Sequence, residues 1–386
     1  MSKVIVEINN IVFDNWKSVS ITKDMNSICG TFSMTAFYDY TGSKTPWQLS
    51  GVIKISYIDD KNGKYRVMTG YVESVNTSIT NGGLNVQIAG RDITCDLVDC
   101  TFNDKTEIMD ITVLEMYKSF VEPYDLNVWS LLPSSKDNKI VKRKNNTANE
   151  KVGDVIVSIS KELGIIPTTD GTGDLILEGK SDGIPIYISA EEKLLSGRID
   201  GQLVLGTDGN ILEASHNSDY TKRYSSIRVI DNADNETRII EKDGASTAID
   251  GLAVDPTYDL KTINKKVRTR MLTTTSTNSG KTDIEKLEEE ANWKMMLSRA
   301  SVSTIKVKVQ GWLASDELWT INRVVDCDLS VLGLEKSTML IKAITFEISD
   351  GGSFTNMELV HSNSFEDITF KTSDDEKTTQ KRFIKK

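Results

Sequence analysis

Alternation of apolar and polar positions dominates the first hundred residues. Apolar side chains fall on every second position, which is the period of a β-strand with one buried face. The runs are separated by turns at residues 59–63 and 81–83, both with glycine, which readily adopts the positive φ that tight hairpins need. The pattern predicts a compact antiparallel sheet or barrel. Its predicted strands are residues 3–8, 51–58, 66–75 and 84–89.

From residue 106 the period changes to that of helices. Thr112 and Glu115 form a capping box in front of an apolar run that Glu122 and Pro123 end, because proline clashes with the preceding helical turn. A second helix is predicted between Val152 and Leu163, with Gly164 as its left-handed cap. Short strands at residues 174–178 and 185–189 follow. Residues 101–219 are therefore predicted to form a small mixed α/β domain.

Strand patterns resume in the last third of the chain. The predicted elements are strands at residues 225–231, 236–242, 303–312, 324–331, 339–348 and 354–360, and a helix at residues 283–300 behind a second capping box, Thr282 with Glu285. Residues 66–89 and 339–360 resemble each other, since each holds an alternating strand, a turn ending in Gly-Gly and a returning strand. This similarity predicts two copies of one β-domain.

Together these patterns predict a mainly β protein with an α+β insertion. We expect a first β-barrel domain at residues 1–100, the mixed α/β domain at 101–219, and a second β-barrel domain at 220–365 that includes the helix at 283–300. Residues 366–386 are too polar to form a core and are predicted to be a flexible tail.

Composition argues against several classes of protein. The chain has 386 residues, with 46 Lys and Arg against 56 Asp and Glu, so its net charge is −10. A net negative charge cannot neutralise a phosphate backbone, so it argues against sequence-specific nucleic-acid binding. We expect no membrane span and no signal peptide, because no long apolar run occurs. Four scattered cysteines predict a reducing compartment: Cys29, Cys95, Cys100 and Cys327.

Candidate chemistry is sparse. His216 and His361 lie in no zinc-binding or catalytic motif, and residues 170–174 lack the ligand pattern of a calcium loop, so they are predicted to be a glycine-rich turn. We therefore expect a non-enzymatic protein with no catalytic, cofactor-binding or metal-binding residues. A basic loop without aromatic residues is predicted to be solvated or to contact an acidic neighbour: Lys139, Lys142, Arg143 and Lys144. The six tryptophans occur singly, as core or interface residues do.

One string carries a family resemblance. Residues 90–101 read GRDITCDLVDCT directly after a predicted hairpin, and this string resembles a segment of the Mu-type phage baseplate hub proteins. The stretch 209–215, the triplet Arg223-Tyr224-Ser225 and the closing Gly351-Gly352 hairpin agree in kind. The resemblance extends over roughly residues 4–365, nearly the whole chain.

The resemblance implies a structural role in a contractile tail. It implies two tail-tube-like barrels per subunit and a homotrimer that forms a pseudo-sixfold ring. The ring would join the sixfold tail tube to the threefold central spike and let DNA pass, past a wall that the acidic excess could line. Besides the other two copies, the implied partners are the spike, the tube, the baseplate wedge proteins and the tape-measure protein.

The same resemblance implies a place and an interface. The protein would lie in the virion tail baseplate after assembly in the host cytoplasm. It would be related to the N-terminal hub region of type VI secretion spike proteins, but without their spike β-helix, so we expect the spike to be a separate polypeptide. We expect Arg91, Asp92, Asp96 and Asp99 to lie near the subunit interface.

Two other classes of function compete with the hub. A tail-associated peptidoglycan hydrolase would need a catalytic glutamate in a cleft or a zinc site, for which the chain has few histidines and cysteines. A carbohydrate-binding β-sandwich adhesin would need surface aromatic residues clustered at one loop end. A cell-wall turbidity assay and the solution mass separate these alternatives.

Overall fold

The computed structural model describes residues 3–13, 16–38, 51–59, 63–80, 83–102, 107–108, 110–132, 134–141, 144–145, 149–179, 186–188, 193–195, 198–204, 210–233, 236–237, 239–242, 245–248, 250–276, 284–334 and 336–361. Their contacts form two compact units. Unit 1 comprises Met1–Asp219 and Ser303–Ser362, and unit 2 contains Tyr220–Val302.

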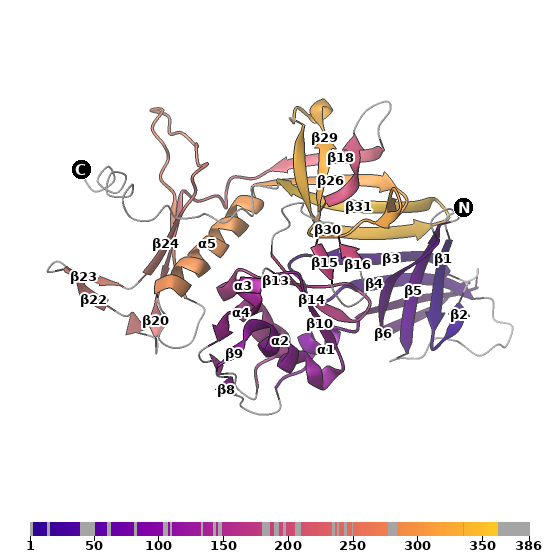
Figure 1. The fold of residues 1–386 in the computed structure, drawn as a ribbon. Coiled ribbons are helices and arrows are strands. Elements are labelled where there is room, and N and C mark those ends of the chain that lie inside the picture. Colours follow the sequence, from indigo (N-terminus) through magenta and orange to yellow (C-terminus); the bar gives the residue numbers. More distant parts are fainter. Residues whose placement is uncertain are drawn as a thin grey trace. The chain divides into compact units, whose positions relative to one another are not determined.

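A sheet of 13 strands organises unit 1 (Figure 1). Its main path runs β18-β26-β31-β30-β3-β4-β7-β6-β5-β1-β2, and β29 and β17 extend it beside β30. The strands are β1 (Lys3–Ile8), β2 (Ile11–Phe13), β3 (Trp16–Asp24), β4 (Thr31–Tyr38), β5 (Val52–Asp59), β6 (Gly63–Thr80), β7 (Gly83–Asp92), β17 (Arg198–Val204), β18 (Ile211–Ser218), β26 (Ser303–Gln310), β29 (Val324–Asp328), β30 (Ser337–Ser349) and β31 (Gly352–His361).

All strands predicted within the first hundred residues are confirmed, but β3 and β4 were missed and they form the centre of the sheet. The β6–β7 hairpin flanks β4, and the β30–β31 hairpin flanks β3. Antiparallel pairing from Val19 with Ile348 to Asp24 with Ala343 joins the two halves of the chain (Figure 1). The two β segments that the sequence separates therefore share one sheet.

Two strands do not belong to the mixed α/β domain in which the sequence places them. β17 and β18, which were expected in the mixed α/β domain, pair with β29 and β26. A predicted strand at residues 324–331 ends at Asp328, and a 3-10 turn, η2 (Ser330–Leu332), follows it and ends at Gly333 with φ 75°. The short strands β27 (Leu313–Ala314) and β28 (Glu317–Leu318) pair with each other.

The large sheet has one apolar and one polar face. On β3 the buried Val19 and Ile21 alternate with the half-buried Ser20 and Thr22, as expected of a period-2 strand. On the apolar side the indole of Trp312, fully buried, stacks on Tyr57 of β5 with ring centroids 5.0 Å apart. It also contacts Phe346 of β30 at 5.0 Å. Because β5 and β30 lie five strands apart in the sheet order, the sheet must curve around this tryptophan.

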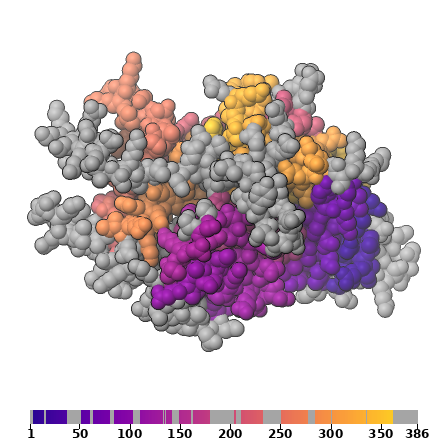
Figure 2. All heavy atoms as spheres, in the orientation of Figure 1, coloured from indigo at the N-terminus to yellow at the C-terminus, as the bar shows by residue number. Residues whose placement is uncertain are grey.

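The mixed segment of unit 1 has its own core. The helices α2 (Val113–Val121) and α4 (Val152–Leu163) pack with the sheet β10-β14-β13 around Met116, Ile156 and Leu175. The Thr112–Glu115 capping box and the left-handed Gly164, with φ 61°, are confirmed. In Figure 2 this segment, in magenta, adjoins the indigo surface of the first strands.

The remaining elements of this segment are short. They are α1 (Cys95–Asp99), β8 (Glu107–Ile108), β9 (Ile111–Thr112), η1 (Glu122–Tyr124), β10 (Asn127–Ser130), α3 (Ser134–Asp137), β11 (Ile140–Val141), β12 (Lys144–Asn145), β13 (Ile166–Thr169), β14 (Asp174–Glu178), β15 (Ile186–Ile188) and β16 (Lys193–Leu195).

A buried ion pair ties β14 to the start of β29. The carboxylate of Glu178 accepts hydrogen bonds from both terminal nitrogens of Arg323, at 2.9 and 3.3 Å, and from the amide of Asn322. The side chains of Glu178 and Arg323 are only 8% and 7% exposed. Such a pair is costly to break, because the remaining charge would be left buried without a partner.

Unit 2 is a small α/β layer. The helix α5 (Ile284–Ala300) covers one face of a three-stranded sheet of order β24-β19-β25, formed by β24 (Asp250–Val254), β19 (Ser226–Ile230) and β25 (Met271–Thr275). Leu287, Ala291 and Met295 of the helix pack on Ile227 and Val229. Two hairpins complete it: β20 (Asn232–Ala233) with β21 (Glu236–Thr237), and β22 (Ile239–Lys242) with β23 (Ala245–Ala248).

A glycine allows the helix to approach this sheet closely. A Cβ atom on Gly251 would lie 2.2 to 2.3 Å from backbone atoms of Leu287 and Glu288, closer than any real contact. The predicted helix at residues 283–300 is confirmed, although Thr282 of its expected capping box lies outside the described residues. The expected tail at residues 366–386 also lies outside them.

Candidate functional site

Arg91 is the centre of a surface ion cluster at the end of β7. Its guanidinium donates to both carboxylate oxygens of Glu73, at 2.5 and 2.7 Å, and to both of Asp99. These hydrogen bonds raise the pKa of Arg91 and hold the pKa of Asp99 below its ordinary value. Arg91 therefore joins α1 to β6.

Asp92 and Asp96 have different surroundings. Asp92 is fully buried and accepts hydrogen bonds from the Gly30 amide at 2.8 Å and from the amide and hydroxyl of Thr94. Burial raises its pKa. Asp96 is half-buried, and its burial, followed by the charge of Asp99, raises its pKa. Arg91, Asp96 and Asp99 thus lie at the surface, whereas the Asp92 carboxylate holds neighbouring backbone together.

Sequence reasoning missed Glu73. It occupies the bulge in β6 between Val72 and Ser74, where an extra residue interrupts the pairing with β7. A bulge redirects a side chain, and here the redirected carboxylate meets Arg91. Neither the alternation of the strand nor its spacing from residue 91 indicates that contact.

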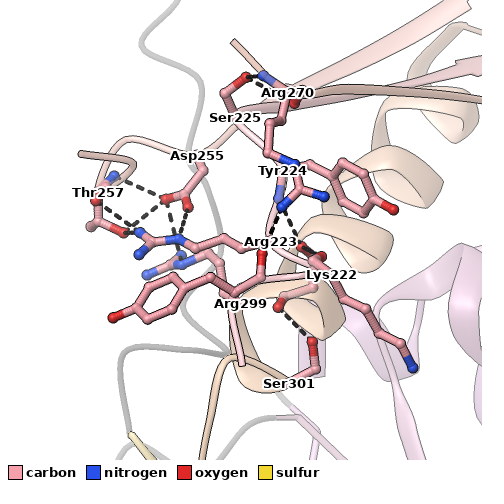
Figure 3. Close-up of polar contacts among 11 residues, drawn as sticks. Lys222, Arg223, Tyr224, Ser225, Asp255, Thr257, Arg270, Arg299 and Ser301 are labelled. Atoms are coloured by element: carbon pink, nitrogen blue, oxygen red, sulfur yellow. Dashed lines mark hydrogen bonds and ion pairs between the residues drawn. The ribbon is translucent and has the colours of Figure 1, made fainter. Parts of the chain in front are cut away.

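A second cluster lies at one end of the unit 2 sheet, where β24 ends and β19 and β25 begin (Figure 3). The side chain of Asp255 is inaccessible to solvent and faces two arginines. Arg223 donates to it at 2.9 Å, and Arg299 from the end of α5 lies 3.8 Å away. Arg223 also donates to the carbonyl and the hydroxyl of Thr257, at 2.8 and 2.9 Å.

Arg270 holds the other side of this cluster (Figure 3). Its guanidinium donates to the carbonyls of Tyr220 and Thr221, both at 2.6 Å, and lies 5.4 Å from the ring centroid of Tyr224. Its backbone amide donates to the Ser225 hydroxyl at 2.9 Å. The triplet Arg223-Tyr224-Ser225, noted in the sequence, therefore anchors both ends of the loop between β24 and β25.

That loop projects a short basic hairpin, which we call the basic arm (residues 260–268). Its backbone bonds run from Thr262 N–H to Lys266 C=O at 2.7 Å and from Arg268 N–H to Leu260 C=O at 2.8 Å. Every residue from 261 to 269 is exposed. The arm holds four basic residues and no acidic one. In Figure 1 it is part of the long orange loop beyond β24.

The other residues singled out in the sequence are His216, the turn at residues 170–174 and the basic loop. His216 on β18 lies within hydrogen-bonding distance of the hydroxyls of Ser303 and Ser218, at 2.9 and 3.0 Å. Residues 170–174 form a turn, as predicted: the Asp170 carboxylate accepts the amides of Thr172, Gly173 and Asp174 at 2.7 to 3.1 Å. Lys142 and Arg143 of the expected basic loop lie outside the described residues.

The described ranges lack both a metal-binding cluster and a membrane-spanning helix. They contain no group of three or more His, Cys, Asp or Glu side chains that could hold a metal ion. Their helices include none that is long and apolar enough to cross a membrane. Burial raises the pKa of the Cys95 and Cys327 thiols to about 12, so both stay protonated at neutral pH.

Comparisons with known proteins give these features a family context. Residues 3–92 match the model of the Mu phage baseplate assembly protein GpP-like N-terminal domain, and residues 94–179 match the second domain of the gp44-like baseplate hub proteins. The baseplate hub protein gp44 of Escherichia phage Mu is 23% identical over 356 residues, which cover 88% of this chain and 82% of that protein. The chain is a relative of the Mu-like phage baseplate hub proteins.

Solved structures agree with this fold. A 43 kDa tail protein from prophage MuSo2 of Shewanella oneidensis aligns with a TM-score of 0.74 at 20% identity, covering 95% of this chain and all of that one. An Escherichia coli type VI secretion component, described as structurally similar to the phage T4 tail proteins gp27 and gp5, aligns with a TM-score of 0.50 at 6% identity, covering 94% and 76%. The expected relationship to the hub family is confirmed.

The two clusters lie differently with respect to the segments that match the family models. Arg91 and Asp92 lie in the first matched segment, and Asp96 and Asp99 in the second. The Asp255 cluster and the basic arm lie outside both matched segments.

Proposed function

We propose that this chain is the structural baseplate hub of a contractile phage tail. Three copies would form a ring with pseudo-sixfold symmetry, which adapts the sixfold tail tube to the threefold central spike and lets DNA pass. Each copy would supply one tube-like β-domain from residues 1–100 and a second from the strands of unit 1 after residue 197. The mixed α/β segment would lie between them in sequence.

The arrangement of the large sheet carries this proposal. The central pair β3–β4 has a long hairpin on each side, β6–β7 next to β4 and β30–β31 next to β3. One chain therefore contributes two similar β-hairpin modules, which is what a trimer needs to present six similar positions. Their join through β3 and β30 leaves the modules within one sheet.

The ends of the sheet support assembly with other copies. In the described part of the chain, β2 pairs with β1 and β18 pairs with β26, so each ends the sheet path. Ile11 of β2 is 61% exposed and Leu212 of β18 is 51% exposed. Unpaired strand edges with apolar side chains invite pairing with another chain, and a closed ring of copies would cover them.

The polar face of the sheet supports the passage of DNA. Ser20 and Thr22 of β3 lie opposite Ser33 and Thr31 of β4; Ser33 and Thr31 are exposed, and Ser20 and Thr22 are half-buried. Hydroxyls offer no strong attraction to a polyphosphate, whose binding is dominated by cations. We propose that this hydroxyl-rich face lines the channel, together with part of the chain's acidic excess.

The proposed partners are the other two copies, the central spike, the tail tube, the baseplate wedge proteins and the tape-measure protein. The proposed place is the tail baseplate of the virion, reached after assembly in the host cytoplasm. That Arg91, Asp92, Asp96 and Asp99 lie near the subunit interface stays a prediction.

Electron microscopy of the purified chain, alone and mixed with the spike protein of the same tail, tests this proposal. Class averages should show rings with a central opening and six similar densities. A turbidity assay on purified cell walls is the matched control for the hydrolase alternative. Particles without rings under both conditions, together with clearing of the cell walls, would overturn the hub in favour of the hydrolase.

A further inference from the structure

The basic arm is an ordered projection in unit 2. Its hairpin is closed by an antiparallel bridge between Lys261 and Val267, and Lys265 N–H donates to Thr262 C=O at 2.9 Å. Lys265 adopts a left-handed φ of 59°, which completes the turn. The arm therefore has a defined backbone although its side chains contact little of its own unit.

Its base is held firmly. Arg223 fixes Thr257 and Asp255 at the start of the loop, and Arg270 fixes Tyr220 and Thr221 at its end. A preorganised loop loses less conformational entropy on binding than a flexible one. The anchored base therefore keeps the arm in one position from which it can bind a partner.

The chemistry of the arm is cationic with an apolar tip. Among the described residues, Lys261, Lys265, Lys266 and Arg268 form no ion pair. Ile263 is fully exposed at 102%, and Val267 is 53% exposed. Exposed aliphatic side chains beside charges are typical of a protein contact, in which the apolar group is buried and the charges surround it.

The partner must therefore be a protein with an acidic surface. The chain as a whole has a net charge of −10 although the arm is basic, so the rest of it is more acidic still. Duplex DNA would be repelled by that acidic remainder, and the arm lacks the aromatic side chains on which nucleic-acid bases stack.

We propose that the basic arm of one copy docks on the acidic surface of a second copy of this chain. This inference rests on the proposed self-assembly of the hub. In this complex the side chain of Ile263 would be buried against the second copy. The four cations would orient the two copies and speed their association, since charge complementarity steers the encounter between proteins.

Two variants test the arm in the full-length chain. The first removes three charges, Lys261→Gln, Lys265→Asn and Lys266→Gln, where asparagine suits the left-handed position. The second, Ile263→Ser, removes only the apolar tip. The matched control removes three exposed lysines elsewhere, Lys3→Gln, Lys118→Gln and Lys286→Gln, so that the net charge changes equally.

Solution mass across protein concentration, at low and high salt, is the first readout. Self-association of the first arm variant should weaken about threefold to a hundredfold at low salt, because the variant loses up to three exposed ion pairs. Ile263→Ser should weaken it at both salt concentrations, and the control should associate like the wild type. If both arm variants associate like the wild type, the inference is wrong while the hub proposal stands. If the wild type itself never associates, the hub proposal fails first.

Carbodiimide crosslinking, which joins lysine amines to carboxylates, is the second readout. Copies labelled with ¹⁴N and ¹⁵N are mixed before crosslinking, so that mixed-isotope products identify contacts between chains. We expect arm lysines joined to Asp or Glu of the other isotope. Products confined to one isotope would contradict the proposal. So would a gel shift of linear duplex DNA that the arm variants lose while their self-association is unchanged, since it would assign the arm to DNA.

Discussion

Unit 1 and unit 2 use buried carboxylates for different purposes. In unit 1, Glu178 binds Arg323, a residue 145 positions away, and so joins the mixed segment to the large sheet. In unit 2, Asp255 binds Arg223 and faces Arg299, and it closes the base of a loop whose other cations are exposed. In unit 1 the buried ion pair therefore links segments that are distant in the sequence. In unit 2 the buried carboxylate holds the base of a loop that carries an exposed basic surface.

The largest effect that separates the units is expected from Glu178→Gln. The variant leaves Arg323 buried without its carboxylate, so the free energy of unfolding of unit 1 should fall by about 3 to 5 kcal/mol. Chemical denaturation followed by tryptophan fluorescence measures it. The control is Glu7→Gln, which removes the partner of Lys64 in an exposed pair and should cost less than about 1 kcal/mol. Equal losses in the two variants would contradict the assigned role of Glu178.

Gly251→Ala should weaken unit 2 alone. Its Cβ would meet the backbone of α5, and such overpacking costs typically about 1 to 3 kcal/mol. Hydrogen exchange should become faster in β19, β24 and α5 and stay unchanged in β3 and β30. Gly179→Ala is the control, because no atom lies within 4 Å of a Cβ placed there. Faster exchange throughout unit 1 would show that the two units do not unfold separately.

Arg91→Gln should shift the pKa of Asp99 but should lower the free energy of unfolding only slightly. The pKa of Asp99 is lowered chiefly by its hydrogen bonds to Arg91, so the variant should raise that pKa toward its ordinary value. The ion pair stabilises the fold above the ordinary pKa of the carboxyl group, and this contribution is lost as the pH falls through the lowered folded value. Since Asp99 is 52% exposed, the loss should be below about 1 kcal/mol.

Carboxyl NMR titration of Asp99 gives the direct measurement, and Lys64→Gln is a control that leaves Arg91 in place. An Asp99 pKa that does not move in Arg91→Gln would mean that Arg91 is not its controlling neighbour.

The smallest effect should come from neutralising the basic arm. Lys261→Gln with Lys265→Asn and Lys266→Gln should change the free energy of unfolding by less than about 0.5 kcal/mol, as is usual for surface substitutions. Thermal unfolding checks this. A loss of several kcal/mol would show that the arm is part of the core of unit 2 and would sharpen the contrast with unit 1.

Local signals in the sequence predicted local structure well. The capping box of Thr112 with Glu115 and the glycine cap at Gly164 identify two helices. Such signals are reliable because the backbone N–H and C=O groups at a helix end lack partners within the helix. The alternating run at residues 339–348 likewise predicts β30. The strand β3 was missed because its apolar positions, Val19 and Ile21, are few and lie among serine and threonine.

Long-range pairing could not be predicted in the same way. Nothing near β18 in the sequence indicates β26 as its partner, and the pairing of β3 with β30 joins segments more than 300 residues apart. The bond of Glu73 to Arg91 depends on a strand bulge, which depends in turn on the register with β7. The basic arm, by contrast, is visible in the sequence as the run KTINKKVRTR at residues 261–270, but its exposure and anchoring are not.

The central claim is that this chain assembles with itself into a threefold hub. Light scattering of the purified full-length chain over a range of protein concentrations tests it most directly. The account predicts a mass of three times 42.9 kDa, either for the chain alone or once the spike protein is added. A chain that stays at 42.9 kDa at every concentration, with and without the spike protein, would contradict it.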